Sequence, residues 1–294
     1  MASLRSMLRA PRAVSYWLGV GQHRMVEHGD DMVFLCHGTP PATADRLARQ
    51  LRYLRRAFRI VPLAAFAASI GAPRKPGRRR RAALIFDDGL RSNVTVAYPM
   101  LCALGVPAAF FVCPGLIEER RWLWTHEVRC RLQFAGRAPA RIEAVVERMK
   151  KLDYRRRLRA EAALRRATAG FVPSEADREA FDLAGWDELR SLDPALVTVG
   201  SHSMTHPVLP SLDSAGIEAE LRDSRRLIEA RLARPAEFFS YPNGDADERT
   251  LACARRHYRA AVRYHSPSAT DPHQIPCTHL PRGVLSLAWN VNNP

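Results

Sequence analysis

The sequence predicts an α/β fold with one barrel-like domain. Short apolar runs alternate with segments of helical hydrophobic period along most of the chain, a pattern typical of a parallel sheet. Ionisable or turn-forming residues follow directly after several of the apolar runs, and in a parallel barrel such strand ends share one face. The chain has 294 residues, 47% of them apolar, which is enough for one large domain.

The N-terminal part begins with residues 1–30, which show no clear period and are predicted to form a peripheral arm before a domain over 31–294. The elements expected next, from apolar runs and helical spacing, are a strand over 32–36, a helix over 42–58, a short strand over 60–63, a strand over 82–86, a helix over 92–104 and a strand over 106–112. Gly105 is a typical helix stop, so 82–112 forms the strand–helix–strand unit of a parallel sheet.

The middle of the chain does not follow this alternation of strands and helices. Residues 116–185 contain a strongly helical stretch at 141–168 that is rich in Arg, Lys, Glu and Ala. We interpret 116–185 as a helical insertion, which either packs against the barrel or forms a wall of the site. The elements expected after it are a short helix over 186–189, a strand over 196–200, a helix over 214–232, a strand over 237–241, a helix over 248–257, a strand over 258–262 and an extended segment from 274.

Charge and cysteine content limit the choice of partners and compartment. The net charge is +15, from 45 basic and 30 acidic residues, with one dense basic block at 74–81 that is expected to be a solvated loop. The aromatic residues do not alternate with the basic ones as a nucleic-acid surface requires, so no nucleic-acid partner is expected. A basic surface is compatible with peripheral contact to an anionic membrane. The six cysteines form no CxxC pair, and no run of about 18 apolar residues occurs. Together these observations favour a cytoplasmic protein, either free or associated with a membrane surface.

Two adjacent carboxylates follow the strand over 82–86. Asp87 and Asp88 come directly after Phe86 and before Gly89. Neighbouring side chains on a strand point to opposite faces, so both carboxylates converge on one site only where the strand ends. The alternative is an ordinary Asp-Gly turn, which is common.

His202 and His206 follow the strand over 196–200 and are four residues apart. On a helical turn this spacing places both imidazoles on one side. Two histidines and one carboxylate leave coordination positions open, as in a catalytic metal site. Zn²⁺ suits these ligands, and Co, Ni, Fe or Mn are alternatives. The competing interpretation of the pair alone is a surface helix or a capping turn.

The two aspartates need different roles if a metal is present. One carboxylate binds the metal, and the other acts as a general base on the bound water. His37, which follows the strand over 32–36, is the candidate proton donor because an imidazole titrates in the required range.

Three segments together resemble the polysaccharide deacetylases, also called the NodB-homology or carbohydrate esterase family 4 enzymes. They are Ile-Phe-Asp-Asp-Gly at 85–89, His-Ser-Met-Thr-His at 202–206 and Ser-Tyr-Pro-Asn-Gly at 240–244. The resemblance extends over about 33–262. It implies a distorted (β/α)7-type barrel and a metal-dependent hydrolase of non-peptide C–N bonds, which removes N-acetyl groups from amino sugars of a polysaccharide, glycan or glycan precursor.

The resemblance also implies a role for each matching residue. Asp87 would be the base. Asp88, His202 and His206 would bind the metal, and Tyr241 would help to hold the oxyanion through its backbone N–H.

The proton donor departs from the common family order. The family's acid histidine usually lies late, in a Leu-x-His motif, whereas this chain has Leu-Cys-His at 35–37. In this respect the chain resembles the circularly permuted members that deacetylate exopolysaccharide, and His37 is the expected acid. His265, His273 and His279 are the alternatives near the C-terminus.

Other positions bear on the substrate. Ile85 replaces the family's hydroxyl residue, and Ser240 stands where some members have an arginine that orients the base. Pro242 and Trp124 are the expected substrate-binding residues, although a tryptophan in such a cluster with Trp122 is more often a core residue.

Alternative functions remain at this point. The chain could be a catalytically silent barrel that binds glycan, a hydrolase of another non-peptide C–N bond, or a basic nucleic-acid binder, which is the least favoured. An N-acetylated saccharide is the expected substrate of the enzyme.

Overall fold

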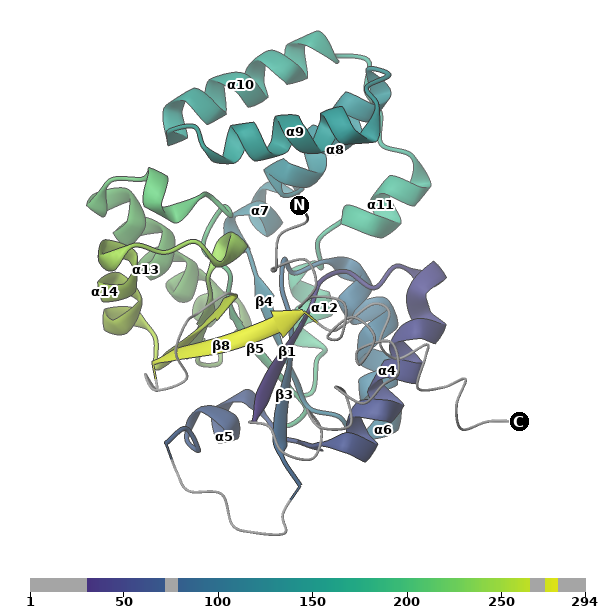
Figure 1. The fold of residues 1–294 in the computed structure, drawn as a ribbon, viewed down its shortest axis with the longest axis vertical. Helices are drawn as coiled ribbons and strands as arrows, with labels where there is room; N and C mark the ends of the chain where they lie inside the picture. Colours follow the sequence, from purple (N-terminus) through teal and green to yellow (C-terminus); the bar gives the residue numbers. More distant parts are fainter. Residues whose placement is uncertain (1–30, 72–78, 265–272, 280–294) are drawn as a thin grey trace, which may run out of the picture.

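A computed structural model describes residues 31–71, 79–264 and 273–279 (Figure 1). The predicted arm over 1–30 and His265 lie outside the described residues, as does most of the basic block. None of the described helices is both long enough and apolar enough to cross a membrane.

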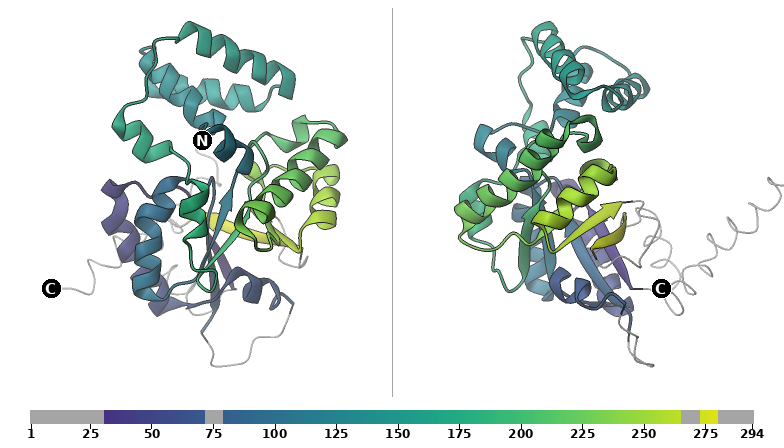
Figure 2. Two further views of the ribbon diagram at one scale, coloured as in Figure 1. Left: turned by 180° about the vertical axis from the view of Figure 1, so that it is seen from behind. Right: turned by 90° about the vertical axis from the view of Figure 1, so that its left-hand side faces the viewer.

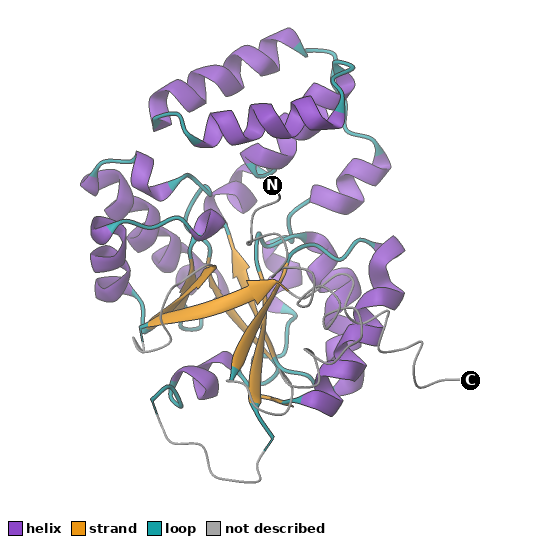
Figure 3. Ribbon diagram, viewed as in Figure 1, coloured by secondary structure: helices purple, strands orange, loops and turns teal. Residues whose placement is uncertain are grey.

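Parallel strands form the centre of the molecule, and helices surround them (Figure 3). Seven strands close into a barrel in the order β1-β8-β7-β6-β5-β4-β3, and closure comes from the pairing of β1 with β3. The short β2 extends the sheet beside β3. The strands are β1 (Met32–Cys36), β2 (Arg59–Ile60), β3 (Arg81–Phe86), β4 (Ala108–Val112), β5 (Val197–Ser201), β6 (Phe238–Ser240), β7 (Ala260–Tyr264) and β8 (Gln274–His279).

Helices connect the successive strands from β1 to β7, and the predicted (β/α)7-type barrel is confirmed. Its helices are α4 (Ala44–Ala57), α5 (Leu63–Ala67), α6 (Tyr98–Leu104), α7 (Pro114–Glu119), α8 (Trp124–Phe134), α9 (Pro139–Lys150), α10 (Tyr154–Ala167), α11 (Glu175–Phe181), α12 (Trp186–Arg190), α13 (Ser214–Leu232) and α14 (Glu248–His257).

Alternation along each strand divides the core into two layers. Val33 and Leu35 of β1 belong to the cluster that fills the barrel interior, together with Ile85 of β3, whereas Phe34 packs outward against the helices. This is the period of two expected when both faces of a sheet are covered. The barrel is therefore filled by side chains, and a ligand site can exist only at its ends.

Helices α8, α9 and α10 stand at one end of the barrel (Figures 1 and 2). They have a hydrophobic cluster of their own, which includes Trp124, Val128 and Val146. They lie between β4 and β5 in the sequence, within the insertion expected over 116–185.

Two expected elements differ from the structure. The strand over 60–63 is limited to β2, because Pro62 has no N–H for the sheet and Leu63 begins α5. The stretch expected to be strongly helical over 141–168 is interrupted at 151–153 and contains two helices, because Asp153 caps α10 by accepting a hydrogen bond from Arg156 N at 2.9 Å.

The turn after β3 depends on Gly89. This residue has φ +70°, and an added Cβ would lie 3.1 Å from Val112. Gly89→Ala is therefore expected to lower the free energy of unfolding by about 1–3 kcal/mol, measured by chemical denaturation. Gly136→Ala is the matched control, since Gly136 has φ +72° but no atom within 4 Å of the added Cβ. Equal losses for the two variants would contradict the close contact at Gly89.

Candidate active site

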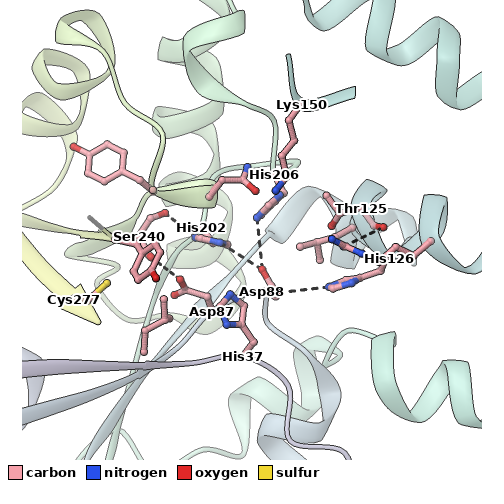
Figure 4. Close-up of a pocket in the computed structure, with 17 residues that line it drawn as sticks. His37, Asp87, Asp88, Thr125, His126, Lys150, His202, His206, Ser240 and Cys277 are labelled. Carbon is pink, nitrogen blue, oxygen red and sulfur yellow. Dashed lines mark hydrogen bonds and ion pairs between the residues drawn. The ribbon is translucent and has the colours of Figure 1, made fainter. Parts of the chain in front are cut away.

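A cleft of about 330 Å³ lies where the strands end. His37 follows β1, Asp87 and Asp88 follow β3, and His202 follows β5, so parallel strands deliver all four to the same face (Figure 4). The convergence of strand ends expected from the sequence is confirmed for these residues.

The two aspartates are held by the backbone in different ways. Asp87 N–H continues the strand ladder by donating to Cys36 O at 3.0 Å. Asp88 has φ 74°, in the left-handed region that non-glycine residues rarely adopt. The turn therefore places both carboxylates at the cleft, and both side chains are buried. Backbone strain of this kind is typical of functional sites.

Asp88, His202 and His206 form a buried group whose ligand atoms all lie within 4.8 Å of one another. Asp88 Oδ1 is 3.5 Å from His202 Nε2 and 3.6 Å from His206 Nε2. Ligand atoms about 2.0–2.1 Å from a tetrahedral Zn²⁺ are about 3.4 Å apart, so this donor set fits a divalent cation.

Residues 202–206 form a loop after β5, and the helical turn expected between the two histidines is wrong. Ser203 has φ 67° and His206 has φ 56°, both in the left-handed region. Side chains hold this path: His206 N–H donates to Ser203 Oγ at 3.0 Å, and Glu220 accepts from Thr205 N–H at 2.9 Å. The imidazoles therefore converge through loop geometry rather than helical spacing.

The tautomer of His202 is fixed by its neighbour. His202 Nδ1 lies 2.7 Å from Ser240 O, and a carbonyl can only accept, so Nδ1 carries the proton and donates it. In the neutral imidazole this leaves the Nε2 lone pair facing Asp88 Oδ1, as a metal ligand requires. Burial lowers the pKa of His206 to about 3, so His206 is neutral at pH 7 and also has a lone pair to offer.

Asp87 has the environment of a base. Ser240 Oγ donates to its Oδ2 at 3.0 Å, while Oδ1 is buried and has no hydrogen-bond partner among the described residues. Burial raises the pKa of Asp87, which makes its carboxylate a better proton acceptor. For Asp88, burial is outweighed by His126 and His202, and its pKa is held well below the usual range.

His37 is exposed and lines the cleft beside the aspartates (Figure 4). An imidazolium at this position would lower the pKa of both Asp87 and Asp88. His273 does not line the cleft, and its Nε2 lies 2.9 Å from Tyr258 O. His279 is described only through its backbone, which pairs with Leu35.

The structure does not support the roles expected of three other residues. Tyr241 N–H donates to Val262 O at 3.1 Å, so this donor is already used in the sheet and is not available to an oxyanion. Trp124 is 3% exposed, which leaves no ring face for a sugar. Its indole Nε1–H donates to His206 O at 3.1 Å and so holds the loop that carries the two histidines. Pro242 is buried and does not line the cleft.

The insertion contributes residues that sequence reasoning did not identify. His126 and Arg129 of α8 and Lys150 of α9 line the cleft. Figure 4 shows His126 facing Asp88, and Lys150 entering from above. No motif spacing connects them with the strand ends, and the only signal was the position of His126 next to the aromatic cluster at 122–124.

Comparisons with known proteins identify the family and agree with the fold. The family model described as polysaccharide deacetylase matches residues 74–262. A search of curated protein sequences found no match. Among solved structures, IcaB from Ammonifex degensii has a TM-score of 0.61 at 17% identity, covering 89% of this chain and 97% of that one. The Streptococcus pyogenes deacetylase PplD in complex with acetate has a TM-score of 0.60 at 14% identity, with 90% and 98% covered. The BpsB deacetylase domain from Bordetella bronchiseptica has a TM-score of 0.54 at 18% identity, with 85% and 95% covered.

Proposed function

The chain belongs to the polysaccharide deacetylase family, and from this premise we propose that it is a metal-dependent hydrolase that removes N-acetyl groups from amino sugars of a saccharide. The observation that carries the proposal is the buried group of Asp88, His202 and His206 beside the carboxylate of Asp87. A glycan-binding barrel has no need for a ligand set of this kind or for a buried base next to it.

Asp88, His202 and His206 would hold the cation. Zn²⁺ is the proposed metal, since two imidazoles and one carboxylate are common ligands of catalytic zinc. When bound, such a cation lowers the pKa of a coordinated water and polarises a carbonyl oxygen.

Two residues beside this centre carry out the two proton transfers of the reaction, one as base and one as acid. Asp87 takes a proton from the attacking water at Oδ1, the oxygen that has no other partner, while Ser240 holds Oδ2. His37 donates a proton to the amine nitrogen that leaves with the sugar. Acetate and the free amine are the products.

Asn243 is the proposed oxyanion donor in place of Tyr241. Its side-chain Nδ2 is buried and has no hydrogen-bond partner among the described residues, and the residue lines the cleft. An amide N–H directed at developing negative charge is a common form of transition-state stabilisation.

The assignment of His37 can be tested against a late histidine. His37→Ala is expected to lower kcat by about 100-fold, because the leaving amine then departs without a positioned acid. His273→Ala is the control and should change kcat by less than about twofold, since its ring faces Tyr258 O away from the cleft. The rates are measured by acetate release at saturating substrate. The reverse ranking of the two variants would assign the acid to the C-terminal segment.

The function itself is tested by acetate release from a panel of N-acetylated saccharides. Purified protein is stripped of metal, reloaded with Zn²⁺ and incubated with oligomers of N-acetylglucosamine and other acetylated amino sugars. We expect acetate and free amines in equal amounts, and only from the reloaded protein. Metal-loaded protein that binds saccharide but releases no acetate from any of them would favour a silent glycan-binding barrel instead.

A further inference from the structure

His126 belongs to the insertion, yet its side chain lies against a residue of the proposed metal site. It is the third residue of α8, and none of the three family-like segments contains it. Among the described residues, the ion-pair contacts of Asp88 are with three imidazoles, those of His202, His206 and His126. The third of these contacts comes from outside the barrel.

The two oxygens of the Asp88 carboxylate face different imidazoles. Oδ1 faces His202 and His206 at 3.5 and 3.6 Å, whereas Oδ2 faces His126 Nε2 at 3.6 Å (Figure 4). The distance to His126 is longer than a hydrogen bond, so the contact is electrostatic. His126 Nε2 is buried and has no hydrogen-bond partner among the described residues. A buried polar atom of this kind normally requires a partner.

His126 is not a fourth ligand in this arrangement. The group of ligand atoms within 4.8 Å of one another contains Asp88, His202 and His206 but not His126. The nitrogen of His126 is therefore directed at Oδ2, the oxygen of Asp88 that faces neither His202 nor His206.

The ring of His126 is held in place by the insertion. It stacks on Phe181 of α11, with ring centroids 4.5 Å apart and planes inclined by 20°. Phe181 in turn packs edge-on against Trp122, whose indole N–H donates to Asp182 at 2.7 Å. The direction of the imidazole is thus fixed by α8 and α11 together.

We propose that His126 is a positioning residue for Asp88: its Nε2–H attracts Oδ2 electrostatically across 3.6 Å, so that Oδ1 would be directed at a bound cation. Partners of this kind orient a ligand and tune the metal. The inference rests on the proposed metal site and extends it, because it makes the metal affinity depend on the insertion.

The test measures Zn²⁺ affinity of the full chain by competition with a chromophoric chelator. His126→Ala is expected to weaken binding by about 10-fold or more, the usual effect of removing a residue that orients a ligand. His126→Gln keeps an N–H donor and should recover most of the affinity, which a purely structural role of the ring would not explain. Gln133→Ala, at an exposed position of the same helix, should leave the affinity unchanged.

Co²⁺ loading adds a spectroscopic measurement. The visible absorption bands of the bound Co²⁺ should change in His126→Ala and return toward the parental form in His126→Gln. A parent that binds Zn²⁺ together with a His126→Ala variant of equal affinity overturns this inference alone. A parent that binds no divalent cation overturns the proposed function, and this inference with it.

Discussion

Asp87→Asn is expected to lower kcat for acetate release by about 1000-fold while the protein still binds its metal. The substitution preserves the size of the side chain but removes the basic oxygen. Asp87 is outside the group that forms the metal site, so loss of its charge leaves the three ligands in place. Its contact with Ser240 can be kept by the amide oxygen of Asn, and the fold should be unaffected.

The measurement combines acetate release with metal content of the same preparation. Asp187→Asn is the matched control, because it makes the same chemical change on α12, where the side chain is 96% exposed and pairs with Arg190. An Asp87→Asn protein with the parental rate would remove Asp87 from its role as the base. An inactive variant that has also lost its metal would reassign Asp87 as a ligand.

His202→Ala has the second large expected effect, the loss of both metal and activity. This imidazole is buried, its Nδ1–H is committed to Ser240 O, and its Nε2 faces Asp88. Without it, two ligands remain, and Zn²⁺ affinity should fall by more than about 100-fold, beyond the range seen when only an orienting partner is removed. Acetate release should fall to the level of the metal-stripped parent.

Chelation separates this explanation from general damage to the fold. Metal removal from the parent should abolish activity, and Zn²⁺ should restore it, whereas the same addition should not restore His202→Ala. His257→Ala is the control, since this imidazole at the end of α14 pairs with Glu218 of α13 and lines no part of the cleft. Full activity of metal-free parent protein would contradict metal dependence.

Sequence patterns identified the parts of the site that depend on strand ends. An apolar run has a period and a length, so the ends of β1, β3 and β5 could be located, and with them His37, Asp87 and His202. The parallel arrangement then required these residues to share a face, which the structure confirms.

Other parts of the site depend on contacts that no local pattern encodes. The loop that carries His206 is shaped by Glu220, which lies in α13, and by the indole of Trp124 in α8. The N–H of Tyr241 is used by Val262 of the adjacent strand, a pairing that becomes visible only when the register of the sheet is known. His126 reaches Asp88 because the insertion folds over the barrel. No pattern of residues in the sequence connects these two positions.

The closure of the barrel by β1 and β3 also determines how far apart the proposed acid and base can be. Cys36 and Phe86 are paired residues in this ladder, and His37 and Asp87 are the next residue on each strand. The distance between their main chains is therefore that between neighbouring strands, about 4.8 Å. The sheet ladder fixes this spacing, so little backbone entropy would be lost in bringing the proposed donor and acceptor to one substrate.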